Sequence, residues 1–395
     1  MILPAGPFNP DAATAAYLST LSPAQHERAI GYTQGGHWLL LWATLVTIGA
    51  MLLIWRSGLL ARIARHVPAR RRNLSVFLCA LGFFVLQWVI ELPWTIYSQW
   101  WRERSYGLTG QSFGGWLGED ILSTTISIVL LGLVAMAIYA LMRRTPRWWW
   151  AWSGLVVVAG IILMVVIAPV AIEPLFNRYT PAPNGPTRDA VRELARRAGV
   201  PGDKIYIYDG SKQSERYTAN VSGLFGTARI AMSDVMFKRG ADLAEVRGVV
   251  GHEMGHYAEH HVLWLAGGMS LLAMLLFFLV DRLYPLAARW FGAGPAIGDP
   301  VHLPVVWAVA SIVGLFLVPI MNSITRFDES AADRFSLKVA HEPDGLAKAL
   351  VKTVEYRAAS PSRLEEILFY DHPSVERRIH RAMEWKAENP QLVGK

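Results

Sequence analysis

The sequence is short of charged residues and of cysteine. Only 17% of its 395 residues are charged, whereas soluble proteins average about 25%. This is too little polar surface to cover a water-soluble protein of this size. The 53% content of apolar residues excludes intrinsic disorder and a fibrous fold. The single cysteine, Cys79, excludes an intrachain disulfide framework and a multi-cysteine metal site. The composition therefore predicts a protein of the lipid bilayer.

The net charge of +7 does not indicate a nucleic-acid partner. Nucleic-acid binding needs basic residues along one polar face, whereas many of these are arginines beside apolar runs, as at membrane boundaries. Tryptophans also gather at the ends of apolar runs, as at 100–101 and 148–150. We expect a multi-pass integral membrane protein, in a cell inner membrane, with the lipid bilayer as its constant partner.

Six apolar stretches are long enough to cross a membrane as helices, which takes about 20 residues. The alternative is a set of buried helices in a large soluble protein, but those usually have about 10–14 apolar residues. The six stretches are residues 29–55 (with an apolar centre at 38–55), 74–90 extending toward 97, 121–142, 148–172, 262–280 and 303–323.

Polar stretches divide the chain around these spans. The expected regions are a polar lead-in at 1–36, four spans within 37–172, a soluble segment at 173–261, a two-span hairpin at 262–323 and a helical tail at 324–395. We expect no cleavable signal peptide, because the lead-in lacks a basic start. In the soluble segment the patterns predict helices at 187–198 and from Asp242 onward, and strands at 204–208 and 229–233.

The helix expected from Asp242 carries His252, Glu253 and His256 in an HExxH pattern. Histidines at i and i+4 project from one face of a helix, so both imidazoles can bind one ion, and zinc suits nitrogen ligands. Glu253 is placed to contact a metal-bound water rather than the metal. The glycines at 251 and 255 are poor helix formers, so we expect another element to pass very close to this helix.

A catalytic zinc takes three protein ligands and keeps one open position. The candidates for the third ligand are His260, His261, Asp328, Glu329 and Asp333. A continuous helix would turn the two histidines away from the motif's face. Glu329 and Asp333 share a helix face, so that one carboxylate can ligate while the other accepts a hydrogen bond from a ligand histidine. The alternative for this segment is the solvated start of a charged helix.

Several motifs together resemble the Ste24-type (CAAX prenyl protease) branch of the M48 integral-membrane zinc metallopeptidases. The HExxH helix matches, and Glu329 through Asp333 match the family's ExxxAD-type motif. Further matches are 92–97 at the end of a membrane helix, 174–181 with the PLFNKFTPL stretch, 220–225 with the NAYFYG-type segment, and 372–379 with the HPxxxxRI tail. The extra N-terminal span of the eukaryotic members is expected to be absent. The resemblance implies about six membrane helices around a chamber, with a small α+β zincin-like metallopeptidase domain.

The resemblance also implies a role for each matching residue. His252, His256 and Glu329 bind one zinc ion per chain, and Glu253 is the general base. Asp333 and Arg378 support the ligands, His372 steadies the reaction intermediate, and Asn220 binds the substrate backbone. The expected function is a membrane zinc metalloendopeptidase that acts on a peptide or protein, lipidated or membrane-associated.

Three alternatives stay open from the residues. The first is a quality-control protease for membrane proteins without prenyl specificity, and the second is a non-catalytic zinc-binding scaffold or transporter. The third, a site-2-type intramembrane protease, would place HExxH inside a span, but polar residues such as Asp242 and Glu245 flank the motif here.

The membrane orientation is open as well. The arginines at 56–72 and 143–147 place their loops in the cytoplasm by the positive-inside rule, and the HExxH segment on the opposite side. The family resemblance implies a site that opens toward the cytosol.

Overall fold

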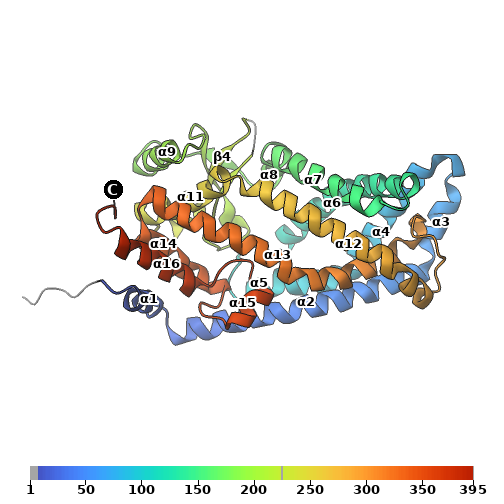
Figure 1. Ribbon diagram of the computed structural model, residues 1–395, viewed down its shortest axis with the longest axis horizontal. Coiled ribbons are helices and arrows are strands. Elements are labelled where there is room, and N and C mark those ends of the chain that lie inside the picture. Colours follow the sequence, from blue (N-terminus) through green and yellow to red (C-terminus); the bar gives the residue numbers. More distant parts are fainter. Residues whose placement is uncertain (1–7, 224–225, 395) are drawn as a thin grey trace, which may run out of the picture.

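The computed structural model describes residues 8–223 and 226–394, so Leu224 and Phe225 of the predicted substrate segment lie outside the described residues, as do residues 1–7 of the lead-in. Membrane helices run along the length of the molecule, and a small α/β head lies at one end (Figure 1). Within the described residues six helical segments are long and apolar enough to span a membrane, which confirms the predicted number. They are Pro23–Ser57, Ala69–Ser105, Phe113–Arg144, Trp149–Phe176, His261–Phe291 and Pro300–Ala340.

Two of these segments change helix type near a proline. Helix α4 (Arg72–Thr95) contains Pro93 and continues as a π-helical stretch, η2 (Ile96–Trp101), before the short α5 (Arg102–Ser105). Helix α7 (Trp149–Ile167) likewise continues as η3 (Ala168–Ile172), where Pro169 lies, and then α8 (Glu173–Phe176). A proline lacks the N–H that a regular α-helix needs, so wider turns accommodate it.

The N-terminal region differs from the expected polar lead-in. Ser22 and Gln25 form a capping box, so helix α2 (Pro23–Ser57) begins well before the apolar run and takes in residues 23–36. Helix α1 (Pro10–Leu18) precedes it, capped by Asn9. Tyr17 and its neighbours on α1 pack against the core that includes helix α16 (Val375–Glu388). The start of the chain therefore packs against the C-terminal helices.

The last membrane helix also differs from the expected division. Helix α13 (Leu303–Ala340) continues without a break past residue 323, where the predicted tail begins. Neither proline nor glycine occurs between 320 and 340 to end it. Glu329 and Asp333 therefore lie on the same helix as the sixth span.

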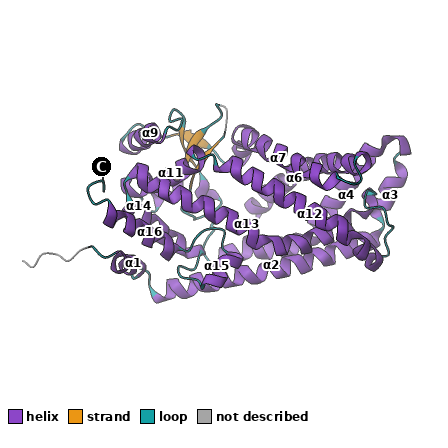
Figure 2. Ribbon diagram, in the orientation of Figure 1, coloured by secondary structure: helices purple, strands orange, loops and turns teal. Residues whose placement is uncertain are grey.

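The head contains a four-stranded sheet, seen in orange in Figure 2. In the described chain its strand order is β1-β2-β4-β3, with β2 and β4 parallel and the outer pairs antiparallel. The strands are β1 (Tyr179–Pro181), β2 (Ile205–Tyr208), β3 (Ala219–Ser222) and β4 (Arg229–Ser233). Strands β2 and β4 coincide with the predicted ones to within a residue. The head's apolar core joins the sheet to helices α9 (Pro186–Ala198) and α11 (Leu243–Ala258), with Val191, Ile230 and Val250 fully buried.

Helix α9 (Pro186–Ala198) ends at Gly199, which takes the left-handed conformation at φ 68° as predicted. The remaining helices are α3 (Leu59–His66), α6 (Phe113–Arg144), α10 (Asp234–Lys238), α11 (Leu243–Ala258), α12 (His261–Phe291), α14 (Pro343–Lys352) and α15 (Arg363–Phe369), with 3₁₀ turns at η1 (Ala69–Arg71), η4 (Gly210–Lys212), η5 (Pro300–His302) and η6 (Thr353–Tyr356).

The glycines of the HExxH helix mark a close helix crossing, as expected. A Cβ atom at position 255 would lie 3.0 Å from the Cα of Ala332, and one at 251 would lie 2.9 Å from Ser336 Oγ. Ser336 also donates a 2.7 Å hydrogen bond to the carbonyl of Gly248. The small residues on both helices let α11 and α13 approach closely enough for their polar side chains to meet.

Candidate metal centre

Helix α11 presents both histidines of the motif toward α13. Asp242 caps its first turn by accepting a 2.8 Å hydrogen bond from the Glu245 N–H. His252 and His256 then follow one turn apart, with their rings 4.9 Å between centroids. The side chain of Glu329 on α13 lies directly opposite both of them.

The acceptor atoms of three side chains converge at this point. His252 Nε2 lies 3.2 Å from His256 Nε2 and 3.2 Å from Glu329 Oε2, and His256 Nε2 lies 3.4 Å from Glu329 Oε1. A tetrahedral zinc ion with bonds of about 2.0–2.1 Å separates its ligand atoms by about 3.3 Å. Glu329 Oε2 is buried without a hydrogen bond of ordinary geometry. In the part of the chain that the structure describes, these three side chains form a group that could hold a metal, and their spacing fits a single ion.

His252 is held by a buried ion pair. Its Nδ1–H donates to Asp333 Oδ1 at 2.9 Å, which leaves Nε2 as the atom that faces the site. Asp333 in turn accepts two hydrogen bonds from Arg378, both of 2.7 Å. Burial disfavours a charged His252, yet the bonds to Asp333 and Glu329 outweigh it and raise the pKa of His252 to about 10. The pocket thus attracts positive charge strongly, as a cation site does.

His256 is supported by His261, which a continuous helix would turn away from the site. The chain takes a left-handed conformation at His260 (φ 56°), so α12 starts in a new direction. This brings His261 Nδ1 to 3.1 Å from His256 Nδ1, while His261 Nε2 lies 3.2 Å from Glu259. Because His261 Nε2–H donates to Glu259, the unprotonated His261 Nδ1 accepts a hydrogen bond from His256 Nδ1–H. The expectation failed because it assumed an unbroken helix.

Glu253 and His372 line a cavity of about 490 Å³ next to the three converging side chains. Burial raises the pKa of Glu253, which suits a group that must accept a proton. His372 Nε2 lies 3.2 Å from Glu329 Oε2, and its Nδ1 lies 2.8 Å from Asp371. Burial also lowers the pKa of His372, with a further contribution from the Arg357 charge. We call this cavity the His252-side pocket.

A second cavity of about 370 Å³ touches His256, the other candidate ligand histidine. Membrane helix α7 and its η3 extension supply much of its lining, through Met164, Val165 and Ala168. We call it the His256-side pocket. Edge strand β3 borders both cavities, since Ala219 lines the first and Val221 lines the second.

Asn220 lies between those two strand residues and lines neither cavity. Its Oδ1 is buried without a hydrogen-bond partner, and it belongs to the strand beside α11. The structure thus brings seven of the predicted site residues together and leaves Asn220 on the neighbouring strand. The seven are His252, Glu253, His256, Glu329, Asp333, His372 and Arg378.

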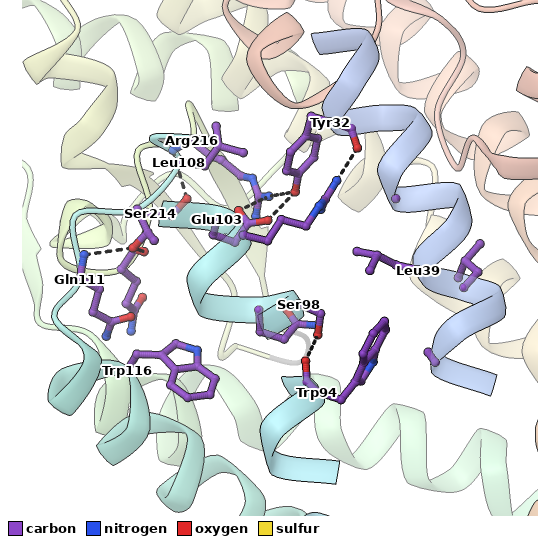
Figure 3. A pocket seen from close by; sticks show the side chains of 17 residues that line it. Tyr32, Leu39, Trp94, Ser98, Glu103, Leu108, Gln111, Trp116, Ser214 and Arg216 are labelled. Carbon is purple, nitrogen blue, oxygen red and sulfur yellow. Dashed lines mark hydrogen bonds and ion pairs between the residues drawn. The ribbon is translucent and has the colours of Figure 1, made fainter. Parts of the chain in front are cut away.

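A third cavity, of about 420 Å³, lies between helix α2 and the α4–η2–α5 segment. Figure 3 shows Arg216, Glu103 and Tyr32 meeting on one side of it, with Trp94, Leu39 and Trp116 around the rest. Arg216 Nη2 donates to Glu103 at 2.8 Å and to the Tyr32 hydroxyl at 2.9 Å. Arg216 and Tyr32 also line the His252-side pocket, so this polar cluster separates a cavity among membrane helices from the candidate metal centre.

The sequence does not reveal the places of two residues of this region: His261, a candidate ligand that a continuous helix would turn away, and Arg357. A third histidine five residues after His256 was visible in the sequence, but its contact depends on the turn at His260. Arg357 lines the His252-side pocket from the segment after α14, and no local pattern connects it with the motif.

Comparison with known proteins agrees with this geometry. The sequence profile of peptidase family M48 matches residues 181–386, just over half of the chain, and that of the CAAX prenyl protease N-terminal region, described as five membrane helices, matches residues 10–178. The uncharacterized metalloprotease YhfN of Bacillus subtilis is 27% identical over 81% of this chain and 75% of its own length. A CAAX prenyl protease 1 homolog of Arabidopsis thaliana is 28% identical over 75% of this chain and 70% of its own.

The fold is shared with a solved structure. The crystal structure of Ste24p from S. mikatae superposes with a TM-score of 0.72 over 95% of both chains, at 21% identity. This likeness confirms the helical membrane fold with its small sheet. The chain belongs to peptidase family M48, as a multi-pass membrane metallopeptidase whose N-terminal region is of the CAAX prenyl protease type.

Proposed function

We propose that this protein is a zinc-dependent endopeptidase that holds one zinc ion per chain and cleaves peptides at the membrane. The observation that carries the proposal is the convergence of two imidazoles and one carboxylate. His252 Nε2 and His256 Nε2 lie 3.2 Å apart, and Glu329 lies 3.2 Å from the first through Oε2 and 3.4 Å from the second through Oε1. Zinc is the metal we infer, because two imidazoles and one carboxylate are a common ligand set for catalytic zinc. This arrangement leaves the fourth ligand position to water and substrate.

A zinc ion at this site would supply Lewis acidity, which activates water and polarises the scissile carbonyl. Glu253 accepts the proton of the attacking water and returns it to the leaving amine. Its buried carboxylate, with a raised pKa, is matched to both transfers. In its protonated form His372 donates from Nε2 toward the oxygen that becomes negative, while its Nδ1–H donates to Asp371.

The supporting residues keep these groups in place. Asp333 fixes the His252 ring and is itself fixed by Arg378, so the lone pair of Nε2 points into the site. Strand β3 is an edge of the sheet beside α11, and an extended peptide can pair with such an edge. We assign Asn220 to this strand-like binding of substrate backbone. A peptide along β3 would run from one pocket to the other past the metal site.

The substrates we infer are membrane-associated or lipidated polypeptides, as the names of the CAAX prenyl protease relatives suggest. The helices that carry the proposed ligands lead directly into spans α12 and α13, so a substrate held in the bilayer lies close to the site. Comparing a prenylated peptide with its unprenylated form, on the purified protein, tests this specificity. Equal cleavage of both would favour the quality-control alternative.

Glu253→Gln is the sharpest test of the chemistry. The variant keeps all three ligands, so metal content should stay at one zinc per chain. Peptidase activity should fall by about 10²–10⁴-fold, because the proton acceptor is lost. Metal analysis and hydrolysis of a labelled peptide measure the two effects. Activity at the wild-type level in this variant would contradict the proposed role of Glu253, and stoichiometric zinc without any hydrolysis by the wild type would favour a scaffold.

A further inference from the structure

The His252-side pocket is lined by more guanidinium groups than carboxylates. Three guanidinium groups line it, those of Arg216, Arg357 and Arg378, whereas the one carboxylate in its lining is Glu253. Arg378 is paired with Asp333 at 2.7 Å, and Arg216 with Glu103 at 2.8 Å. Among the described residues no carboxylate lies within 4.0 Å of Arg357. Within the described chain, Arg357 is therefore the guanidinium group of this lining that no ion pair holds.

The surroundings of Arg357 keep it in the pocket. Its guanidinium carbon lies 5.5 Å from the centre of the Tyr356 ring, and that of Arg216 lies 5.1 Å from the same ring. Tyr356 thus has two cations near its ring, and it lines the same cavity as Glu253 and His372. Arg357 shares this lining with Glu253 and His372, so its charge lies in the same cavity as the proposed catalytic groups. An anion bound here would lie within the substrate-binding cavity.

The opposite pocket has a different chemistry. Its lining is mainly apolar, with Met164, Val165, Pro169 and Val262, and its one carboxylate is Glu173. Glu173 is already paired with Arg229 of strand β4. A peptide lying along β3 would therefore meet an apolar pocket on one side of the metal site and a cationic one on the other.

We propose that Arg357 is a specificity-determining residue that binds a carboxylate of the substrate on the His252 side of the scissile bond. This inference rests on the proposed peptidase function and names the substrate class of its cationic pocket. The carboxylate can belong to the free C-terminus of the peptide or to an Asp or Glu side chain. Guanidinium groups suit either source, because their fork of N–H donors matches the two carboxylate oxygens.

The test uses one peptide that the wild type cleaves, in three forms. They are a free C-terminal acid, the C-terminal amide, and the amide with Glu as its last residue. We expect kcat/KM for the amide to be about 10–100-fold lower than for the form that supplies the carboxylate, since hydrogen bonds between charged groups contribute about 1.5–3 kcal/mol. Preference for the free acid alone identifies the C-terminus as the source. Preference for the Glu form alone identifies a side chain, and preference for both identifies any nearby carboxylate.

Three variants decide whether Arg357 causes the preference. Arg357→Gln should abolish it, Arg357→Lys should retain part of it, and the exposed Arg363→Gln should leave it unchanged. Equal kcat/KM for the three peptides in the wild type would overturn the inference, as would a preference that persists in Arg357→Gln. Hydrolysis of the amide by the wild type shows that the peptidase function stands even if the inference fails.

A binding measurement covers the case in which Arg357→Gln lacks activity. Calorimetry with the metal-removed, full-length protein can compare the cleavage products from the His252 side, as acid and amide. The wild type should bind the form with the carboxylate about 10–100-fold more tightly, and Arg357→Gln should bind both forms equally. Equal binding of both forms by the wild type would overturn the inference.

Discussion

The two ligand histidines of the candidate metal centre are supported in different ways. His252 rests on Asp333 and Arg378, which are 2% and 7% exposed and come from helices α13 and α16. His256 rests on His261, whose own partner Glu259 is largely exposed. The first support is a buried ion pair joining distant parts of the chain, and the second is a local contact made by a turn at the start of a membrane helix.

The difference indicates how the head and the membrane bundle share the site. The His252 side depends on the tertiary packing of the head, because that packing buries the ion pair of Asp333 and Arg378. The His256 side depends on where α12 begins, and so on the join between head and bilayer. Changes on the first side should therefore damage stability and metal binding together, whereas changes on the second should affect mainly the metal.

Of the changes that test this comparison, Asp333→Asn should have the largest effect on stability and zinc affinity. It leaves the buried Arg378 without its carboxylate partner, and breaking such a pair costs about 3–5 kcal/mol. Zinc affinity should fall by about 10–100-fold as well, because a neutral amide is a weaker acceptor than a carboxylate for the Nδ1–H of His252. Thermal unfolding and zinc titration measure the two losses. Asp234→Asn, which removes a surface pair with Lys238, is the control and should change stability by less than about 1 kcal/mol.

His261→Phe should have a smaller and more selective effect. The ring volume is retained, but the acceptor for His256 Nδ1 is lost, so we expect zinc affinity to fall by about 10-fold with little change in the metal-free unfolding temperature. His260→Asn is the matched control, since asparagine tolerates the left-handed conformation at that position. If the two variants bind zinc equally well, His261 does not support the site.

Val165→Lys tests the apolar character of the His256-side pocket and should have the smallest effect. A buried ammonium there disfavours apolar side chains of the substrate, so kcat/KM should fall by roughly 10-fold for peptides with an apolar residue on that side. Zinc content should not change. Val170→Lys, at a position that is 63% exposed and outside the pocket, is the control. Equal losses in both variants would show that the effect is not specific to the pocket.

Much of the fold was predictable because its signals are local. Apolar runs of membrane length gave the six spans, and β-branched runs gave β2 and β4. The Asp242 cap located the HExxH helix, and the glycines at 251 and 255 predicted the close passage of another helix. The pairing of Glu329 and Asp333 on one face follows from helical spacing alone, and their convergence with the histidines was predicted from the chemistry that a zinc ion requires.

The remaining features depend on contacts between distant segments or on a single backbone conformation. The packing of α1 against α16 joins the two ends of the chain, which no local pattern reveals. His261 reaches His256 only because His260 adopts a positive φ, and a helical projection cannot anticipate that change of direction. The position of Arg357 in the pocket likewise depends on how the segment after α14 folds back toward α11.

X-ray absorption at the zinc edge of the purified protein, combined with metal analysis, tests the central claim most directly. The account predicts one zinc per chain, bound to two imidazole nitrogens and a carboxylate oxygen at about 2.0–2.2 Å, with the carboxylate contribution lost in Glu329→Gln. A zinc environment that is unchanged in Glu329→Gln, or peptide hydrolysis by protein that contains no metal, would contradict it.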